Sequence, residues 1–200
     1  MISAILLAAG ESKRMGQPKQ LLPLGDKTLV EHALDNLLAS RVDEVIVVTG
    51  NQAETIAKKV GKRPVKVVLN PDYRLGMSTS LKTGLASIDK DAEAVMVVLA
   101  DQPFIDAALI NRLIDEFTCR NKGIVVPVFK GKRGHPIIFA TKYRDELLQL
   151  RGDAGAKVLL QSHPDDVLEV AVASGHIHVD IDDMDSYELQ KKKLKKRTNQ

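Results

Sequence analysis

The sequence is short of the residues that build disulfides, aromatic clusters and membrane spans. Its 200 residues include one cysteine, no tryptophan and 4% aromatic residues. The single Cys119 cannot form a disulfide within the chain, and its place in a helical pattern predicts packing rather than a catalytic thiol. Apolar runs stay below the roughly 18 residues that span a bilayer, and residues 1–9 lack the charged start of a signal peptide. We therefore expect a cytoplasmic protein with no membrane partner.

A strong excess of one charge is missing as well. The formal net charge is +3, and six cations lie within residues 191–197, so the remainder of the chain carries a formal charge of −3. The basic segments lack the aromatic rings on which single-stranded nucleic acid stacks. We expect no nucleic-acid partner, and we expect a domain of residues 1–190 followed by a basic, frayed tail at 191–200.

Apolar and amphipathic segments alternate along the first part of the chain. Hydrophobic residues make up 44% of the sequence, and runs rich in valine and isoleucine predict strands buried on both faces at 2–7, 45–49, 65–69, 94–99 and 124–128. Helical patterns lie between them at 29–39, 54–59, 78–87 and 107–120. A Thr28/Glu31 capping box opens the first helix, and Asp106 caps the last. The alternation predicts an α/β protein, a Rossmann-like α/β/α sandwich with a mostly parallel sheet.

The pattern changes after residue 128 without any sign of a linker. Gly131 and Gly134 predict a turn, which is followed by a strand at 137–139, a helix at 142–150, a second turn at Gly152 and a strand at 178–181. The sequence contains no internal repeat and no proline- or serine-rich segment. We therefore expect one domain, whose ligand site lies beyond the carboxyl ends of the parallel strands.

A glycine-rich loop follows the first strand, within the stretch LAAGESKRMGQPKQLLPL at residues 7–24. Gly10 and Gly16 allow the backbone to approach phosphate oxygens without a clash, while Lys13, Arg14 and Lys19 supply positive charge. The spacing matches neither the dinucleotide pattern GxGxxG nor the P-loop pattern GxxxxGK[ST]. The loop predicts a nucleoside triphosphate site of a third class, the alternative being an ordinary glycine turn between strand and helix.

Carboxylates follow two of the predicted strands. Asp101 comes directly after the strand at 94–99, and Mg²⁺ usually takes one or two protein carboxylates and completes its shell with phosphates and water. Asp101 is therefore a candidate magnesium ligand, the alternative being a turn cap before Pro103. A second group of carboxylates lies at the end of the strand expected at 178–181 and comprises Asp180, Asp182, Asp183 and Asp185. These carboxylates would repel one another unless a cation lay between them. The alternative is an acidic loop that caps a helix.

The start of the helix at 78–87 offers free backbone N–H groups and small hydroxyls. Such a helix start suits recognition of a polar ligand, although an ordinary N-cap has the same appearance. The candidate residues here are Asn70, Gly76, Ser78 and Ser80.

The pattern LAAGxSxRMGxxKxLLPL, together with LADQP at 99–103, resembles the signature of the MobA-like nucleotidyltransferases. The two alanines before Gly10 resemble the molybdenum cofactor cytidylyltransferase branch of that family. The resemblance covers nearly the whole chain and implies the nucleotide-diphospho-sugar transferase-like fold. It also implies Mg²⁺ as cofactor and transfer of CMP from CTP to the terminal phosphate of the molybdopterin molybdenum cofactor, with release of pyrophosphate. A molybdoenzyme that receives the product would be a protein partner.

The same resemblance assigns roles to individual residues. Arg14, Lys19 and Asp101 would be catalytic, and Asp101 and Asp182 would hold the metal, with Asp180 as the next choice for the second ligand. The nucleotide would contact Leu7, Ala8, Ala9, Gly10, Arg14, Lys19, Asn70, Gly76, Ser78 and Ser80. The motifs RGHP and GDAGAK would bind the acceptor through Arg133, Gly134, His135, Pro136, Asp153 and Lys157.

Two departures from the family pattern bear on these roles. The segment DIDDMDS replaces the family's DIDTPED, and Lys157 replaces an arginine, which keeps the charge but loses the bidentate fork. Two other functions stay open at this point: transfer of a nucleotide to a sugar or polyol phosphate, and a non-catalytic chaperone that holds the cofactor for a molybdoenzyme. The choice between CTP and GTP is also open.

Overall fold

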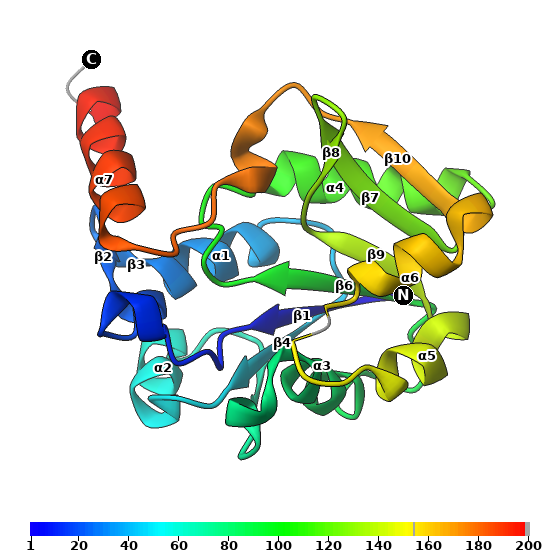
Figure 1. Ribbon diagram of the computed structural model, residues 1–200, viewed down its shortest axis with the longest axis horizontal. Helices are drawn as coiled ribbons and strands as arrows, with labels where there is room; N and C mark the ends of the chain where they lie inside the picture. Colours follow the sequence, from blue (N-terminus) through cyan, green and yellow to red (C-terminus); the bar gives the residue numbers. More distant parts are fainter. Residues whose placement is uncertain (154, 199–200) are drawn as a thin grey trace.

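A mixed β-sheet forms the centre of the computed structural model, which describes residues 1–153 and 155–198 (Figure 1). The strand order is β10-β7-β9-β6-β1-β4-β5, and β8 pairs with β7. Only β9 and β8 run antiparallel to their neighbours among the strands that the structure describes in this sheet. The strands are β1 (Ile2–Leu7), β4 (Glu44–Thr49), β5 (Lys66–Leu69), β6 (Ala94–Leu99), β7 (Ile124–Phe129), β8 (Lys132–Arg133), β9 (Ile137–Ala140) and β10 (Val167–Ala171).

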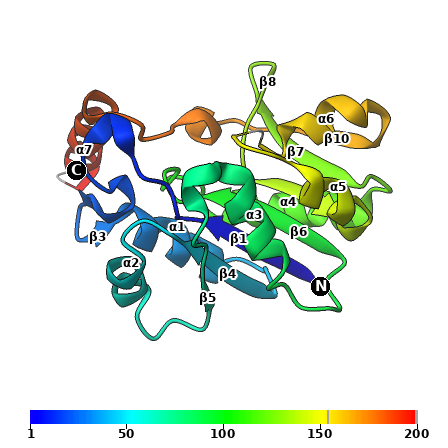
Figure 2. The same cartoon turned by 60° about the horizontal axis from the view of Figure 1, so that its bottom comes forward.

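Helices cover both faces of the sheet. Because successive side chains of a strand point to opposite faces, the central strands contact both helical layers. Ala4 and Leu6 of β1 pack against α1 (Leu29–Leu38), α2 (Ala53–Val60) and α4 (Ala107–Cys119). Ile5 faces the other way, toward α3 (Met77–Leu85), α5 (Arg144–Gln149) and α6 (Lys157–Ser162). Figures 1 and 2 show the two helical layers. The expected sandwich with a mostly parallel sheet is confirmed.

The predicted helix starts are also confirmed at two places. Thr28 and Glu31 form the capping box of α1, in which the backbone N–H of Thr28 donates to Glu31 at 2.9 Å. The side chain of Asp106 accepts a hydrogen bond from the backbone of Leu109 at 2.8 Å and caps α4. Each such cap contributes about 1 kcal/mol.

A separate cluster joins the C-terminal helix α7 (Met184–Thr198) to the hairpin of β2 (Pro23–Leu24) and β3 (Lys27–Thr28). The hydroxyl of Tyr187 donates to the carbonyl of Pro23 at 2.5 Å. The buried members of this cluster are Met15, Leu22, Leu24, Leu29, Ile181 and Tyr187. Helix α7 therefore packs against the segment that follows the glycine loop. The basic segment continues α7 as far as Thr198, whereas residues 199–200 of the expected tail, and Ala154 of GDAGAK, lie outside the described residues.

Three expectations were wrong. Residues 178–181 are not a strand: a 3₁₀ turn (Gly175–His178) and irregular backbone occupy this stretch, and β10, which the sequence did not predict, fills the edge of the sheet. The strand expected at 65–69 is not buried on both faces, because β5 is the opposite edge and leaves Leu69 60% exposed. Cys119 is exposed at the end of α4 rather than packed. Among the helices that the structure describes, none is long and apolar enough to cross a bilayer.

Candidate active site

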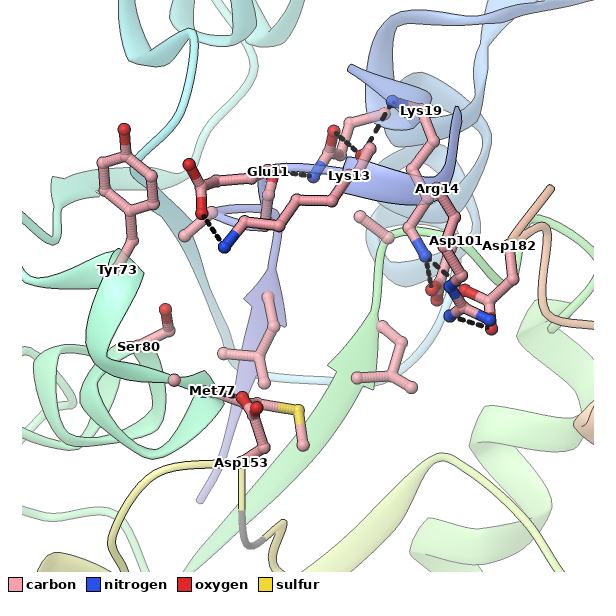
Figure 3. Close-up of a pocket in the computed structure, with 18 of the residues that line it drawn as sticks. Glu11, Lys13, Arg14, Lys19, Tyr73, Met77, Ser80, Asp101, Asp153 and Asp182 are labelled. Carbon is pink, nitrogen blue, oxygen red and sulfur yellow. Dashed lines mark hydrogen bonds and ion pairs between the residues drawn. The ribbon is translucent and has the colours of Figure 1, made fainter. Parts of the chain in front are cut away.

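A pocket of about 400 Å³ opens beyond the carboxyl ends of β1 and β6, where a ligand is expected in a sheet of this kind. Its volume falls within the usual range for sites that bind small molecules. Figure 3 shows Arg14, Lys19, Asp101 and Asp182 on one side of this pocket, Tyr73 and Ser80 on the other, and Asp153 beside Met77. The predicted site residues that line the pocket are Leu7, Ala9, Gly10, Arg14, Lys19, Gly76, Ser80, Asp101, Asp153 and Asp182.

The glycine loop is held in shape by its own hydrogen bonds. Ser12 has a φ of 56° and Gly16 a φ of 65°, and a left-handed serine costs about 1–2 kcal/mol. The hydroxyl of Ser12 accepts from the backbone N–H of Lys19 at 3.0 Å, and the amide of Gln20 donates to the carbonyl of Gly10 at 2.9 Å. These bonds offset the strain and fix the points from which the loop's cationic side chains extend.

An ion cluster joins this loop to the two acidic segments (Figure 3). The ammonium of Lys19 lies 2.5 Å from Asp101 Oδ2 and 2.7 Å from Asp182 Oδ1. The guanidinium of Arg14 lies 2.9 Å from the second oxygen of Asp182. The backbone N–H of Ile181 donates to the carbonyl of Asp101 at 3.1 Å, which brings Asp182 beside Asp101 although no strand precedes it.

Burial and charge act differently on the three groups at the centre of the cluster. Burial raises the pKa of the Asp101 carboxyl above its ordinary value, and the Lys19 charge offsets this only in part. Burial lowers the pKa of Lys19, but the carboxylates of Asp101 and Asp182 outweigh it, so that this pKa is raised. Burial opposes ionisation of Asp182 too, yet hydrogen bonds and charges from Lys19 and Arg14 lower its pKa. Lys19 is therefore held as a cation.

The carboxylates of the cluster suit a divalent cation. Asp101 Oδ1 is buried and has no hydrogen-bond partner, which leaves one oxygen of a desolvated carboxylate available to a ligand. Asp180 points elsewhere, because it accepts a hydrogen bond from the Gln102 amide at 2.5 Å. Within residues 1–153 and 155–198, no three His, Cys, Asp or Glu side chains converge as a ready metal cage. A metal here would have two protein ligands, Asp101 and Asp182, and would take further oxygens from phosphates, as Mg²⁺ usually does.

Three of the predicted nucleotide residues do not reach the pocket surface. Ala8 is fully buried in the core beneath the loop, and Ser78 is 2% exposed behind Met77. Asn70 is 1% exposed, and its amide donates to the hydroxyls of Thr79 at 2.8 Å and Ser80 at 2.9 Å. Asn70 thus anchors the start of α3, since a buried amide must find partners within the protein.

The predicted acceptor residues divide into two groups. Asp153 joins the pocket, and its carboxylate accepts from the backbone of Met77 at 3.2 Å. Arg133 does not line the pocket and pairs with Glu169 of β10 at 2.7 Å. Gly134 and Pro136 are buried, and a Cβ at Gly134 would lie 2.6 Å from the carbonyl of Ile177. Lys157 is exposed at the start of α6 and also lies outside the pocket.

His135 lies behind the pocket wall. It is 8% exposed and lines a cavity of about 10 Å³ with Met77 and Ser78, too small for more than one water molecule. Burial, and secondarily the charge of Lys157, lower the pKa of His135 from 6.5 to about 4. The imidazole is therefore neutral at physiological pH.

This depressed pKa predicts a loss of stability in mild acid. The unfolded chain takes up a proton at residue 135 below about pH 6.5, whereas the folded chain does so only near pH 4. The free energy of unfolding should therefore fall by roughly 2 kcal/mol between pH 7 and pH 5 because of this residue. Urea denaturation of the wild type and His135→Gln at both pH values measures it. A pH-dependent loss of the same size in both proteins would contradict the assignment.

Several residues that line the pocket were not predicted from the sequence. Glu11 lies 3.1 Å from Lys13 and 3.4 Å from Arg74, and so links the glycine loop to the turn before α3. Tyr73 packs against Gly50, where an added Cβ would lie 2.7 Å from the tyrosine side chain. The one sequence signal for Tyr73 and Arg74 was their position between two predicted site residues, Asn70 and Gly76.

Comparison with known proteins identifies one family and relatives that carry different names. The model of the MobA-like NTP transferase domain matches residues 4–167. Nicotine blue oxidoreductase of Paenarthrobacter nicotinovorans is 32% identical over 172 residues, which cover 82% of this chain and 83% of that protein. Molybdenum cofactor cytidylyltransferase of Escherichia coli (strain K12) is 26% identical over 189 residues, 93% of each chain. The crystal structure of Rv0371C from Mycobacterium tuberculosis H37Rv in complex with manganese matches with a TM-score of 0.83 and 31% identity, over 96% of this chain and 98% of that one.

Proposed function

The chain belongs to the MobA-like NTP transferase family, and we propose that it transfers CMP from CTP to the terminal phosphate of the molybdopterin molybdenum cofactor. The observation that carries this proposal is the convergence of Lys19 and Arg14 with Asp101 and Asp182 at the mouth of one pocket. The relative named molybdenum cofactor cytidylyltransferase supports the choice of acceptor, because the two sequences align along 93% of both chains. In this proposal residues 1–190 form the catalytic unit, and residues 191–200 form a basic tail.

The proposed reaction is an in-line displacement at phosphorus. An oxygen of the acceptor phosphate forms a bond to the α-phosphorus of CTP, the bond from that phosphorus to the bridging oxygen breaks, and pyrophosphate leaves with the electron pair. Charge gathers on the α-phosphoryl group and on the leaving pyrophosphate, so positioning and neutralisation supply the catalysis. Lys19 would lie between the α- and β-phosphates, and Arg14 would steady the pyrophosphate.

Asp101 and Asp182 are the proposed ligands of Mg²⁺. The partnerless Asp101 Oδ1 supports a divalent cation at this position. The manganese complex of the mycobacterial relative supports the use of a divalent cation as such. When bound, the metal would neutralise the part of the phosphate charge that Lys19 and Arg14 leave uncompensated. The protein's own contribution is to hold both carboxylates at the end of the glycine loop through the hydrogen bond from Ile181 to Asp101.

The acceptor would enter on the side of Asp153. This residue lines the pocket opposite the glycine loop, close to Met77 (Figure 3). His135 lines a small cavity with Met77 and Ser78, so in this proposal it shapes the acceptor side through these two residues. Lys157 would act on this side through its charge, which also lowers the pKa of His135. A molybdoenzyme that takes up the product is the proposed protein partner.

A preference for CTP over GTP is expected to depend on Ala9. Its methyl group lines the pocket next to Gly50 and Tyr73, where it takes space that a purine would need. One methyl group of steric exclusion supplies about 1–3 kcal/mol, so kcat/KM should favour CTP by roughly 10- to 200-fold. Steady-state kinetics with both nucleotides measures the ratio.

Two variants test the steric explanation. Ala9→Gly should bring the ratio of kcat/KM values closer to one. Ala8→Gly is the matched control, because it removes a methyl group that is buried in the core and does not line the pocket. Equal kcat/KM values for CTP and GTP in the wild type would remove the cytidylyltransferase assignment. An unchanged ratio in Ala9→Gly would leave the preference to other residues.

A further inference from the structure

The ammonium of Lys19 stands between the two carboxylates proposed to hold the metal. It lies 2.5 Å from Asp101 and 2.7 Å from Asp182, and the side chains of Lys19 and Asp101 are each only 16% exposed. The contact with Asp182 lies at the short end of the range for charge-assisted N–H···O hydrogen bonds, and the contact with Asp101 is shorter still. Lys19 thus serves as the internal counter-cation of this carboxylate pair. Any competition between Lys19 and a metal rests on the proposed function, which assigns the metal to these two carboxylates.

A divalent cation and this ammonium would compete for the same two carboxylates. Lys19 and Arg14 contact both oxygens of Asp182, and at Asp101 Lys19 contacts the oxygen beside the partnerless Oδ1. Mg²⁺ binds carboxylate oxygens at about 2.0–2.1 Å, so a metal shared by Asp101 and Asp182 would lie close to the present position of the Lys19 ammonium. Two positive groups this close repel strongly in a site largely removed from water. Departure of Lys19 from the carboxylates would therefore favour binding of the metal by both of them.

The other carboxylates of the described pocket either have cationic partners or lie on its opposite side, where Asp153 accepts from the backbone of Met77 (Figure 3). Glu11 already pairs with Lys13 and Arg74, and the second oxygen of Asp182 pairs with Arg14. The backbone of Lys19 is fixed by its bond to Ser12, so only the side chain is free to change partner. A nucleoside triphosphate brought into the pocket would supply new oxygens within its reach.

We propose that Lys19 keeps divalent metal off Asp101 and Asp182 until the triphosphate takes over its ammonium. Nucleotide and metal then bind cooperatively, because the nucleotide removes the cation that competes with the metal and also adds phosphate ligands. Coupling of this kind is reciprocal, so bound metal also raises the affinity for nucleotide by releasing the carboxylates from Lys19.

Manganese binding to the full chain without nucleotide tests this proposal directly. The probe is Mn²⁺ alone, followed by the electron paramagnetic resonance signal of the free ion during titration. Lys19→Met keeps the length of the side chain and removes its charge, so it should bind Mn²⁺ about 10- to 100-fold more tightly than the wild type. Lys19→Gln is the second variant, and thermal melting establishes that each variant is folded.

Lys13→Met is the matched control. It removes one positive charge from the same loop, but Lys13 is 80% exposed and pairs with Glu11 rather than with the metal carboxylates. We expect its Mn²⁺ affinity to stay within about twofold of the wild type, since an exposed charge is screened by solvent. A gain in this control equal to that of Lys19→Met would reduce the effect to general electrostatics and overturn the proposal.

The remaining outcomes separate this proposal from the proposed function. Equal Mn²⁺ affinities in the wild type and both Lys19 variants, including no measurable binding in any of them, would overturn the competition. If the wild type nevertheless transferred CMP, the proposed function would stand without it. A wild type that bound no CTP in the presence of Mn²⁺ would fail the proposed function itself, whatever the Mn²⁺ affinities of the variants.

Discussion

Asp101→Asn should lower kcat/KM for CMP transfer by roughly 10²–10³-fold or more while leaving the fold intact. The substitution keeps the size of the side chain but removes the charge that a metal ligand needs at the end of β6. The melting temperature should change little, because asparagine removes a desolvated charge and Lys19 keeps Asp182 as an ionic partner. Transfer kinetics at saturating Mg²⁺ and a thermal melt measure the two effects.

Asp180→Asn is the control for this result. Asp180 lies near the same segment but bonds to Gln102 and does not line the pocket. Its loss of activity should be much smaller. Wild-type turnover in Asp101→Asn would mean that Asp101 only caps a turn. A loss of activity in Asp180→Asn larger than that in Asp101→Asn would exchange the proposed roles of Asp180 and Asp182.

Gly76→Ala should destabilise the protein by about 3 kcal/mol, which corresponds to a fall in melting temperature of roughly 6–12 °C. Gly76 has a φ of 109° and a ψ of 169°, a conformation that residues with a Cβ avoid. An added Cβ would also lie 2.3 Å from the backbone of Gly152, which cannot move aside as a side chain can. The two turns that carry Ser80 and Asp153 to the pocket would separate, so transfer should weaken as well.

Gly131→Ala separates strain from collision. Gly131 has a φ of 76°, but nothing lies within 4 Å of its added Cβ, so only the backbone strain of about 1–2 kcal/mol applies. Thermal melts of the two variants should differ by several degrees. Equal melting temperatures would show that Gly152 moves aside freely, contrary to the tight approach of the two turns.

The sequence was sufficient where the signal was local. The apolar run of β1 and the capping box of Thr28 and Glu31 each depend on neighbouring residues, and both were predicted correctly. The glycine loop was recognisable for the same reason, because its cations have a fixed spacing within a few residues. Asp101 follows a strong buried strand, which placed it at the correct edge of the sheet.

Features that depend on distant contacts were not predictable in the same way. Asp182 reaches Asp101 through the hydrogen bond from Ile181 across the chain, and not through the strand expected at 178–181. The edge position of β5 depends on the strand order, which an apolar run does not reveal. RGHP forms one continuous motif in the sequence, yet Arg133 pairs with β10 while His135 is buried near the pocket, because Arg133 ends β8 and residues 134–136 form the connection to β9.

The fate of two phosphorus labels tests the proposed function most directly. CTP labelled at the α-phosphorus and CTP labelled at the γ-phosphorus are each incubated with the wild-type protein, Mg²⁺ and isolated molybdenum cofactor. Only the α-label should appear in the cofactor product, and the γ-label should leave entirely as pyrophosphate, with both processes strongly reduced in Asp101→Asn. Transfer of the γ-label to the cofactor, or no transfer of either label from CTP, would contradict a cytidylyltransferase.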